Sequence, residues 1–398
     1  MRFLSLHSVC LACLLSIFAM PVRLVAQSIS AEGKTTPSLF RIQDLGVVGT
    51  NFTQPGQPFV ISDSGWVSGG SNVGSALHAV LWRGGQMLDI GNPGLGGNSI
   101  AFGVNGQGHA VGEAEDTEAH LSTTEDFCGF QFFGYSTSPK PCVPFISNAG
   151  KMFRLRTLGG VNGVANQINS YGLIAGYAEN TISDPGCSEP QIYEFKPVVW
   201  YGDWVYELPT GNQKEGVAFS VNDRGQVVGA SGSCAPFNPN FLFNFLPAHA
   251  LLWQNGDAVD LGNLEGKLNN FAHDINNRGE VVGGSDVTGD VTSHAFLWTP
   301  QTKKMQDLGT VAADFWSVAL GINDNGQIVG ASANADFSVL RAFVRENGVL
   351  VDLNGLILGQ TNLFLETACS INAKGEIIGL AFDPNTGDIH AYLALPTH

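Results

Sequence analysis

The stretch Ile322-Asn323-Asp324-Asn325-Gly326-Gln327-Ile328-Val329-Gly330 is the clearest of seven related nine-residue phrases in this chain of 398 residues. Each phrase reads aliphatic, Asn, two small or polar residues, Gly, any residue, two mostly aliphatic residues, Gly. The other copies begin at Ile61, Val104, Ile168, Val221, Ile275 and Ile371. The first copy has Ser62 in place of Asn and Ser68 in place of an aliphatic residue. A unit of this size cannot bury its own faces, so the repeat predicts that the copies pack against one another.

Two further phrases accompany each copy in a fixed order. One reads His-Ala-aliphatic-aliphatic-Trp and is clear at residues 78–82, 249–253 and 294–298, with degenerate copies at 143–147, 196–200, 341–345 and 390–394. The other reads Asp-Leu-Gly and is clear at 44–46, 89–91, 260–262 and 307–309, with degenerate copies at 157–159, 207–209 and 352–354. All three phrases therefore occur seven times.

The unit at residues 270–309 predicts four antiparallel strands. Residues 270–276 form the first strand, and Asn276 to Gly279 make a tight turn in which Gly279 accepts a positive φ. Residues 280–285, 293–298 and 304–308 form the other three strands, separated by polar loops. A four-stranded meander of this length is typical of a propeller blade. The turn glycines lie 43 to 64 residues apart, which fits seven blades, some with an inserted loop.

The two ends of the repeat region predict how the ring closes. Residues 41–46 form a fourth-strand phrase with no blade before it, and residues 390–394 form a third-strand phrase with no fourth strand after it. The N-terminal strand is therefore expected to complete the last blade, which removes an exposed sheet edge. We predict an all-β, seven-bladed β-propeller that forms a single domain over residues 40–398.

Composition agrees with this fold and suggests secretion. Glycine accounts for 50 residues, and charged residues make up only 14% of the chain. Residues 9–20 are apolar but too short to span a bilayer, so we interpret residues 1–26 as a signal peptide and 27–39 as a linker. The alternative is a buried N-terminal helix. We expect an extracellular or periplasmic protein with no membrane span.

The net charge of −16 limits the partners. Nucleic-acid binding depends on Lys and Arg that neutralise phosphates, so we expect no nucleic-acid partner and no binding to anionic membrane surfaces. The charge permits a cationic partner or calcium, but an acidic balance also serves solubility.

The three linked phrases resemble the HAF-repeat family of bacterial extracellular proteins, named for a His-Ala-Phe sequence seen here at His294, Ala295 and Phe296. The resemblance covers about residues 40–395 and implies an extracellular β-propeller-like repeat protein. It implies no established biochemical activity, so no catalytic residue is assigned from it.

The chain contains no nucleophile elbow, zinc signature, phosphate loop or dinucleotide fingerprint, so we assign no catalytic residue, cofactor or metal. His78, His249, His294 and His390 share one repeat position, and we interpret them as structural hydrogen-bonding groups. His273 differs, because other blades have mostly apolar residues there, and it precedes Asp274. This pair could act as a base or a metal ligand, but adjacent residues in a strand point to opposite faces.

Three consecutive blades have long insertions between their second and third strands, at about residues 115–142, 179–195 and 232–247. Loops on a rigid scaffold often carry function, and these insertions mix aromatic with acidic residues. The candidate ligand-binding residues are Phe130, Phe133, Tyr135, Phe241 and Phe243. The alternative is that these rings bury one another in a small satellite core.

Five cysteines follow residue 26, after which the mature chain is expected to begin. A secreted chain favours disulfides. Cys128 and Cys142 share one insertion and could staple it, whereas Cys187 and Cys234 lie in neighbouring insertions and could pair across blades. Cys369 aligns with apolar residues and is expected to be a buried free thiol. The alternative is that no cysteines pair.

These observations favour a secreted, monomeric, non-catalytic binding protein whose ligand is a polysaccharide, a peptide or a protein. Two other classes remain open. One is an enzyme, a polysaccharide lyase or hydrolase with carboxylates at the channel mouth, and the other is a structural protein of the cell envelope. The fold alone cannot choose among these classes.

Overall fold

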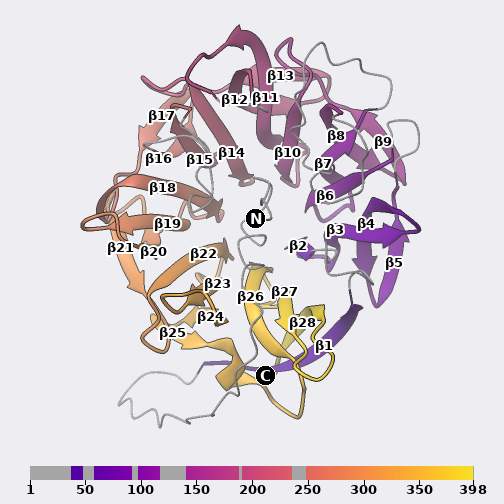
Figure 1. The fold of residues 1–398 in the computed structure, drawn as a ribbon, viewed down its shortest axis with the longest axis vertical. Coiled ribbons are helices and arrows are strands. Elements are labelled where there is room, and N and C mark those ends of the chain that lie inside the picture. Colours follow the sequence, from indigo (N-terminus) through magenta and orange to yellow (C-terminus); the bar gives the residue numbers. More distant parts are fainter. Residues whose placement is uncertain are drawn as a thin grey trace.

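The computed structural model describes residues 37–47, 58–91, 97–116, 140–187, 191–234 and 248–397. Within these ranges the chain forms seven four-stranded antiparallel sheets, arranged as blades around a central axis (Figure 1). The predicted all-β, seven-bladed propeller is therefore confirmed. No helix in the described ranges is long and apolar enough to cross a bilayer.

Six blades consist of four consecutive strands, which follow one another from the axis outward. Blade 1 contains β2 (Pro58–Ile61), β3 (Val67–Val73), β4 (Ala76–Arg83) and β5 (Gln86–Asp89). Blade 2 contains β6 (Ser99–Val104), β7 (Ala110–Glu115), β8 (Cys142–Asn148) and β9 (Lys151–Arg154). Blade 3 contains β10 (Gly163–Ile168), β11 (Ile174–Ser183), β12 (Tyr193–Tyr201) and β13 (Trp204–Glu207). Blade 4 contains β14 (Glu215–Val221), β15 (Val227–Gly232), β16 (His249–Gln254) and β17 (Asp257–Asp260). Blade 5 contains β18 (Glu265–Ile275), β19 (Val281–Val287), β20 (Ser293–Trp298) and β21 (Met305–Gly309). Blade 6 contains β22 (Trp316–Ile322), β23 (Ile328–Ala333), β24 (Leu340–Glu346) and β25 (Val349–Asp352), and the short 3-10 helix η2 (Leu353–Leu356) follows it.

Blade 7 is built from both ends of the described chain. Its strands are β26 (Phe364–Ile371), β27 (Ile377–Phe382), β28 (Ile389–Thr397) and, outermost, β1 (Leu39–Val47). β1 pairs antiparallel with β28, with Arg41 opposite Leu395 and Ile42 opposite Ala394 (Figure 1). The start of the propeller is thereby held in the same sheet as its end.

The asparagine of the nine-residue phrase joins neighbouring blades. In blade 5, Asn276 Oδ1 accepts hydrogen bonds from the main-chain N–H of Arg278 and Glu280, each at 3.0 Å, and so shapes the tight turn. Its Nδ2 donates to the main-chain oxygen of Asn323 in blade 6, at 3.1 Å. The same amide-to-carbonyl link runs from Asn105 to Asn169, Asn169 to Asn222, Asn222 to Asn276, Asn323 to Asn372, and Asn372 to Ser62. We call this series the asparagine ring.

The two glycines of the phrase are needed for different physical reasons. The first, Gly279 in blade 5, has φ = 81°, a conformation that side chains other than glycine rarely adopt. The last, Gly283, lies where the register of the inner strand shifts between Ala272 and Asp274. This irregularity presses the Phe271 carbonyl oxygen against Gly283, so that a Cβ there would collide with it.

The hydrophobic core lies between blades rather than inside one. Each major cluster combines side chains of adjacent blades, as shown by the cluster that joins Trp253 of β16 with Ala175 of β11. Trp200 and Trp253 are 1% and 2% exposed, and their indole N–H groups donate to the main-chain oxygens of Arg156 and Pro209, both at 2.7 Å. These two tryptophans of the second sequence phrase therefore pack between blades.

The recurrent histidines join the third and fourth strands of their blades. His294 Nδ1 lies 3.0 Å from Asp307 Oδ2, and Asp307 Oδ1 accepts the Gly309 N–H at 2.7 Å. Equivalent pairs are His78 with Asp89, His249 with Asp260, and His390 with Asp44. The histidine of the second sequence phrase thus contacts the aspartate of the third phrase. The structural interpretation of these histidines is confirmed.

The predicted N-terminal segments lie largely outside the described residues. The signal peptide at 1–26 and most of the linker at 27–39 are in this undescribed part, so both stay predictions. The described propeller begins with β1 at Leu39, one residue before the expected boundary.

Candidate functional site

The two ends of the disc differ in their connections. In each antiparallel blade the tight asparagine turn and the turn between the third and fourth strands lie at one end, which we call the turn end. The connections between second and third strands, and those that lead to the next blade, lie at the other end. We call that the insertion end, because the long insertions of blades 2, 3 and 4 emerge there.

The predicted ligand-binding residues lie outside the described ranges. Phe130, Phe133 and Tyr135 belong to the undescribed part of the blade 2 insertion, and Phe241 and Phe243 to that of blade 4. The structure does describe the bases of these insertions. In blade 3 the structure corrects the predicted loop at 179–195. Strands β11 and β12 continue into the insertion, where Ser183 pairs with Tyr193. Much of that insertion is therefore an extended sheet rather than a loop.

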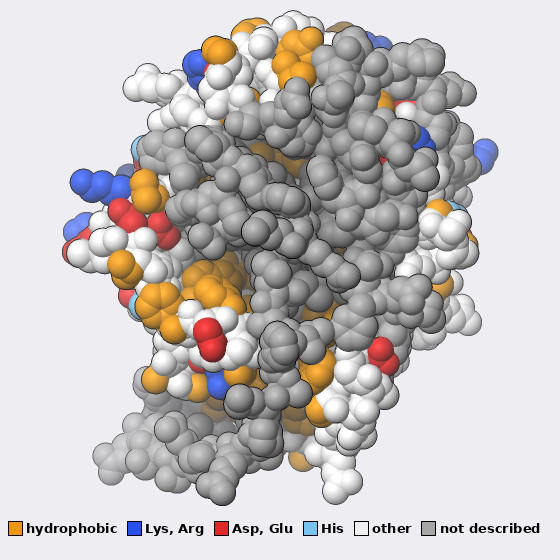
Figure 2. Space-filling view, viewed as in Figure 1, with side chains coloured by type: hydrophobic (Ala, Val, Ile, Leu, Met, Phe, Trp, Pro, Cys, Tyr) orange, Lys and Arg blue, Asp and Glu red, His pale blue; other side chains and the backbone are white. Residues whose placement is uncertain are grey.

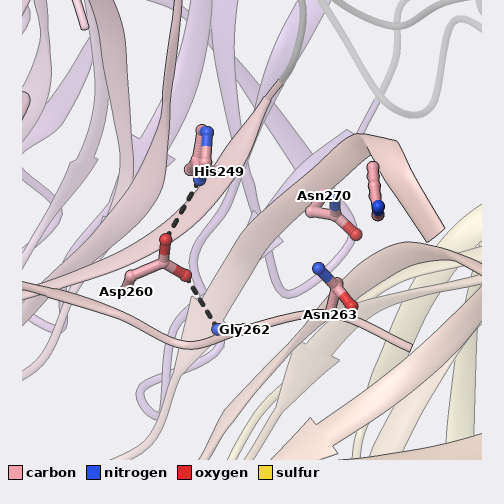
Figure 3. Close-up of a pocket in the computed structure, with 6 residues that line it drawn as sticks. His249, Asp260, Gly262, Asn263 and Asn270 are labelled. Atoms are coloured by element: carbon pink, nitrogen blue, oxygen red, sulfur yellow. Dashed lines mark hydrogen bonds and ion pairs between the residues drawn. The ribbon is translucent and has the colours of Figure 1, made fainter. Parts of the chain in front are cut away.

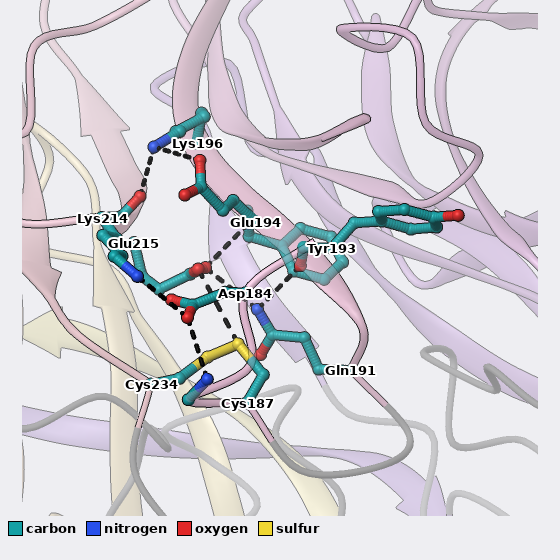
Figure 4. Close-up of a disulfide and its surroundings, with 11 residues drawn as sticks. Asp184, Cys187, Gln191, Tyr193, Glu194, Lys196, Lys214, Glu215 and Cys234 are labelled. Carbon is teal, nitrogen blue, oxygen red and sulfur yellow. Dashed lines mark hydrogen bonds and ion pairs between the residues drawn. A yellow bond between two sulfur atoms is a disulfide. The ribbon is translucent and has the colours of Figure 1, made fainter. Parts of the chain in front are cut away.

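A disulfide joins the insertions of blades 3 and 4 (Figure 4). Cys187 follows β11, and Cys234 follows β15, with 4.8 Å between their Cα atoms. This bond was predicted from the sequence and is confirmed. It ties two segments from different blades at the insertion end, so neither can move independently there.

The other predicted cysteine assignments have mixed outcomes. Cys142 and Cys369 are also disulfide-bonded, and their partners lie outside the described residues. The bond from Cys142 to Cys128 therefore stays a prediction. The assignment of Cys369 as a free thiol is wrong, although its burial on β26 is as expected. Alignment with Phe and Leu in other blades indicated burial but carries no information on disulfide pairing.

Two ion pairs surround the Cys187–Cys234 disulfide. Lys214 Nζ lies 3.0 Å from Asp184 Oδ1, and Lys196 Nζ lies 2.8 Å from Glu194 Oε2 (Figure 4). Lys196 also donates to the main-chain oxygen of Lys214. Burial alone would raise the pKa of Asp184, but hydrogen bonds from Gly186 N–H and Lys214, with the nearby lysine charges, outweigh it and lower that pKa. These contacts link β12 of blade 3 to the start of blade 4.

Glu215 is the one acid of this group that lacks a lysine in contact with its carboxylate among the described residues. It is 1% exposed, and its Oε2 accepts hydrogen bonds from Phe195 N–H at 2.7 Å and Gln191 Nε2 at 2.9 Å. Burial raises the pKa of Glu215 to about 7. Ligand atoms of Asp184, Cys187, Glu215 and Cys234 lie within 4.8 Å of one another. With both sulfurs in the disulfide they are not thiolates, so this cluster acts as a structural brace.

A cavity of about 560 Å³ lies between blades 4 and 5 (Figure 3). It is lined by His249, Asp260, Gly262, Asn263, Lys267 and Asn270. His249 and Asp260 are paired through Nδ1 at 3.0 Å, and Asp260 also accepts the Gly262 N–H at 2.8 Å. The His249 side chain is 39% exposed, whereas the other three paired histidines are 11–23% exposed. The cavity thus offers an imidazole, an amide and an ammonium group to a polar ligand.

Sequence reasoning identified His249 as a structural hydrogen-bonding group but missed its partner Asp260 and the cavity. The length of the connection from blade 4 to blade 5 offered no signal, because residues 262–272 are as many as 91–101 and 309–319 in other blades. The difference is structural: β18 begins at Glu265, which has φ = 76°, and this segment carries Lys267 past the exposed side of His249.

His273 and Asp274 make contacts between blades. His273 Nδ1 lies 2.8 Å from the Leu320 main-chain oxygen, and its ring stacks on Phe219 at 5.8 Å. Burial lowers the pKa of His273 to about 4, so this histidine is neutral at pH 7. Asp274 accepts hydrogen bonds from Ser220 Oγ at 2.7 Å and Ile322 N–H at 3.0 Å. Both side chains connect blade 5 to its neighbours, which is a structural role.

Comparisons with known proteins reveal distant likenesses only. No protein-family model matches the chain, and neither does any curated protein. Among solved structures, acylaminoacyl peptidase of Pyrococcus horikoshii is 8% identical with a TM-score of 0.47, over 85% of this chain and 51% of that one. The β-propeller domain of the Trilobed protease from Pyrococcus furiosus is 7% identical with a TM-score of 0.46, over 90% and 97%. Trypanosoma rangeli sialidase, in complex with the inhibitor DANA, is 9% identical with a TM-score of 0.38, over 90% and 55%.

The chain therefore spans about half the length of the peptidase and of the sialidase that it matches. A function proposed for this protein has to rest on its own residues.

Proposed function

We propose that this protein is a secreted, non-catalytic β-propeller that binds a polysaccharide, a peptide or a protein at its insertion end. The Cys187–Cys234 disulfide is the observation that carries the proposal, because it joins the bases of two insertions from neighbouring blades. Segments fixed before binding lose less conformational entropy when a ligand arrives. The disulfide also supports an oxidising compartment outside the cytoplasm.

The surroundings of the disulfide support the same proposal. The ion pairs Lys214–Asp184 and Lys196–Glu194 brace the bases of the insertions. The cavity that His249 lines lies beside Ala248, the described residue that follows the blade 4 insertion.

The test is a screen of the mature protein on glycan and peptide arrays. Captured ligands are then measured with the pairs Phe130→Ala/Phe133→Ala and Phe241→Ala/Phe243→Ala. We expect capture to be lost while the melting temperature stays nearly unchanged, because binding energy concentrates in a few anchors. If these variants unfold but still capture the ligand, the rings form a core and the binding surface lies elsewhere.

An enzyme is a second candidate, with one observation in its favour. Burial raises the pKa of Glu366, on inner strand β26, to about 7, the range in which a carboxyl group can donate a proton at neutral pH. Polysaccharide depolymerisation that is present in the wild type and absent in Glu366→Gln would support a lyase or hydrolase. Asp274, an acid on inner strand β18, is a matched control, because its carboxylate is already occupied by three donors.

A further inference from the structure

Blade 3 exposes three aromatic side chains at its outer edge. Tyr201, at the end of β12, is 58% exposed, and Trp204 and Tyr206 of β13 are 67% and 53% exposed. Tyr201 pairs directly with Trp204 across the hairpin, and Tyr206 pairs with Val199. We call Tyr201, Trp204 and Tyr206 the aromatic patch.

The register of the hairpin places all three rings on one face. Trp200 and Val205 form the intervening pair, and both pack into the core shared with blade 2. Side chains alternate along a strand, so the pairs on either side of Trp200 and Val205 face blade 4. Blade 4 covers Val199, which packs into the core shared by the two blades, but the aromatic patch extends beyond that cover. Figure 1 places β12 and β13 at the upper rim, and Figure 2 shows hydrophobic side chains along that rim.

The repeat provides an internal comparison, and blade 3 departs from it. The pairs that correspond to Tyr201 and Trp204 in blades 1, 2 and 4 are Arg83 with Gln86, Asn148 with Lys151, and Gln254 with Asp257. The asparagine turn of blade 3, at the same end, has Tyr171, which is 72% exposed. Its counterparts in the other blades are all polar: Ser64, Gln107, Arg224, Arg278, Asn325 and Lys374. The fold therefore does not require aromatic residues at the positions of Tyr201, Trp204 and Tyr171. The position of Tyr206 is apolar in other blades too, as Leu88 and Phe153 show, so it does not set blade 3 apart by itself.

Exposed apolar groups that the fold does not need indicate a binding surface. Because an aromatic side chain presents roughly 150–250 Å², three rings more than half exposed offer on the order of 350 Å². That is well below the roughly 800 Å² per partner of a stable protein interface. The area instead matches a few sugar rings, whose C–H faces pack on aromatic rings while their hydroxyl groups remain in water.

The charge near the patch narrows the ligand class. Asp203 and Glu207 flank the aromatic residues and are exposed, and the chain carries a net charge of −16. A uronic acid polymer or a sulfated glycan would meet like charges there. Carboxylates accept hydrogen bonds from sugar hydroxyl groups. We propose that the aromatic patch of blade 3 binds a neutral polysaccharide, on a surface separate from the insertion end.

Affinity electrophoresis tests this inference. The full-length mature protein is run in native gels that contain hydroxyethyl cellulose, laminarin or galactomannan. We expect retardation by at least one of these neutral polysaccharides. The double variant Trp204→Ser/Tyr206→Ser should bind at least about tenfold more weakly, because it removes two of the three rings of the patch and binding energy concentrates in few anchors. Its melting temperature should be unchanged, because both rings are exposed.

The matched control is Phe153→Ser, at the position in β9 of blade 2 that corresponds to Tyr206 and is 54% exposed. This variant should bind as the wild type does. Phe130→Ala/Phe133→Ala should also keep the retardation, which separates this inference from the proposed function of the insertion end. No retardation by any of the three polysaccharides, or equal retardation of the double variant, overturns the inference. A concentration-dependent dimer that the double variant loses would identify a second copy as the occupant and also overturn it.

Discussion

His390 Nδ1 lies 2.9 Å from Asp44 Oδ2, a contact between residues 346 positions apart in the sequence. It repeats the histidine–aspartate contact of other blades, but here the two residues come from opposite ends of the propeller. The side-chain pair thus reinforces the main-chain pairing of β1 with β28.

Removal of residues 27–46 should open the ring. The deletion leaves β28 as an unpaired edge strand and removes Phe40, which is 1% exposed and packs on Leu353 and Tyr392, so these apolar residues lose their cover. We expect aggregation, measured by light scattering, and a lower melting temperature. Deletion of residues 27–36 alone is the control and should remain soluble. A soluble 27–46 deletion of unchanged stability would contradict the closure by β1.

The asparagine ring should contribute strongly to stability. Asn276→Ala removes two turn hydrogen bonds, the bond from Nδ2 to Glu280 Oε2 and the link to Asn323, and Asn276 is 4% exposed. At about 1 kcal/mol for each hydrogen bond, we expect a loss of roughly 4 kcal/mol in the free energy of unfolding, measured by urea denaturation.

In the first blade, a substitution can add a hydrogen bond to the asparagine ring instead of removing one. Ser62 already accepts the Trp66 N–H through its Oγ at 3.0 Å but is too short to reach blade 2 as an asparagine does. Ser62→Asn should add the link to the main-chain oxygen of Asn105 and stabilise the protein by about 1 kcal/mol. Gln86→Asn, at an exposed position of the same blade, is the control. A destabilised Ser62→Asn would show that blade 1 does not accept the geometry of the ring.

Glu215 should make stability fall as pH rises. Its pKa is raised from 4.5 to about 7 in the folded protein, so folding favours the protonated form. The corresponding stabilisation is complete below about pH 4.5 and is lost as pH rises through 7. Glu215→Gln keeps both hydrogen bonds, because Phe195 and Gln191 both donate to Oε2, and it removes the titration.

The melting temperature of Glu215→Gln should therefore decline less than that of the wild type between pH 5 and 8. The shift in pKa corresponds to a difference of about 3 kcal/mol at most. Glu207→Gln, at an exposed position, should follow the wild-type curve. Parallel curves for the wild type and Glu215→Gln would show that the buried carboxyl group does not titrate in this range.

The Cys187–Cys234 disulfide should stabilise the insertion end. Mass mapping of unreduced protein should detect the peptide pair that contains both cysteines. Cys187→Ser/Cys234→Ser opens a loop of 47 residues and should cost about 2–4 kcal/mol in the free energy of unfolding. If peptides of Cys187 were found linked to another cysteine, the assigned arrangement of blades 3 and 4 would be wrong.

Much of the fold could be predicted because seven copies of the repeat encode the same local geometry. Gly279 and its counterparts indicated tight turns, and the spacing of the phrases indicated four strands in a blade. The sequence showed that Asn276 shapes a turn, but its second contact, with Asn323, depends on how closely two blades approach. Such a distance is a tertiary property that no single repeat contains.

Binding sites were harder to predict, because they too depend on how neighbouring blades meet. The cavity beside His249 forms only where blades 4 and 5 meet, and the insertion residues Phe130 and Phe241 lie outside the described ranges. The aromatic patch could have been found by aligning the outer strands, since Trp204 stands where other blades have Gln86, Lys151 and Asp257. A repeat pattern is defined by the residues that recur, and the informative residue at this position is the one that does not recur.

The asparagine ring has a consequence for how this protein opens. A linear repeat protein frays from its terminal units, because each end unit has only one neighbour. Here Asn372 donates to the main-chain oxygen of Ser62, so the first and last blades are neighbours and the array has no terminal unit. Any single blade must break contacts on both sides before it can leave. Amide hydrogen exchange at the seven turns should therefore proceed at similar rates, through global unfolding rather than progressive loss from one end.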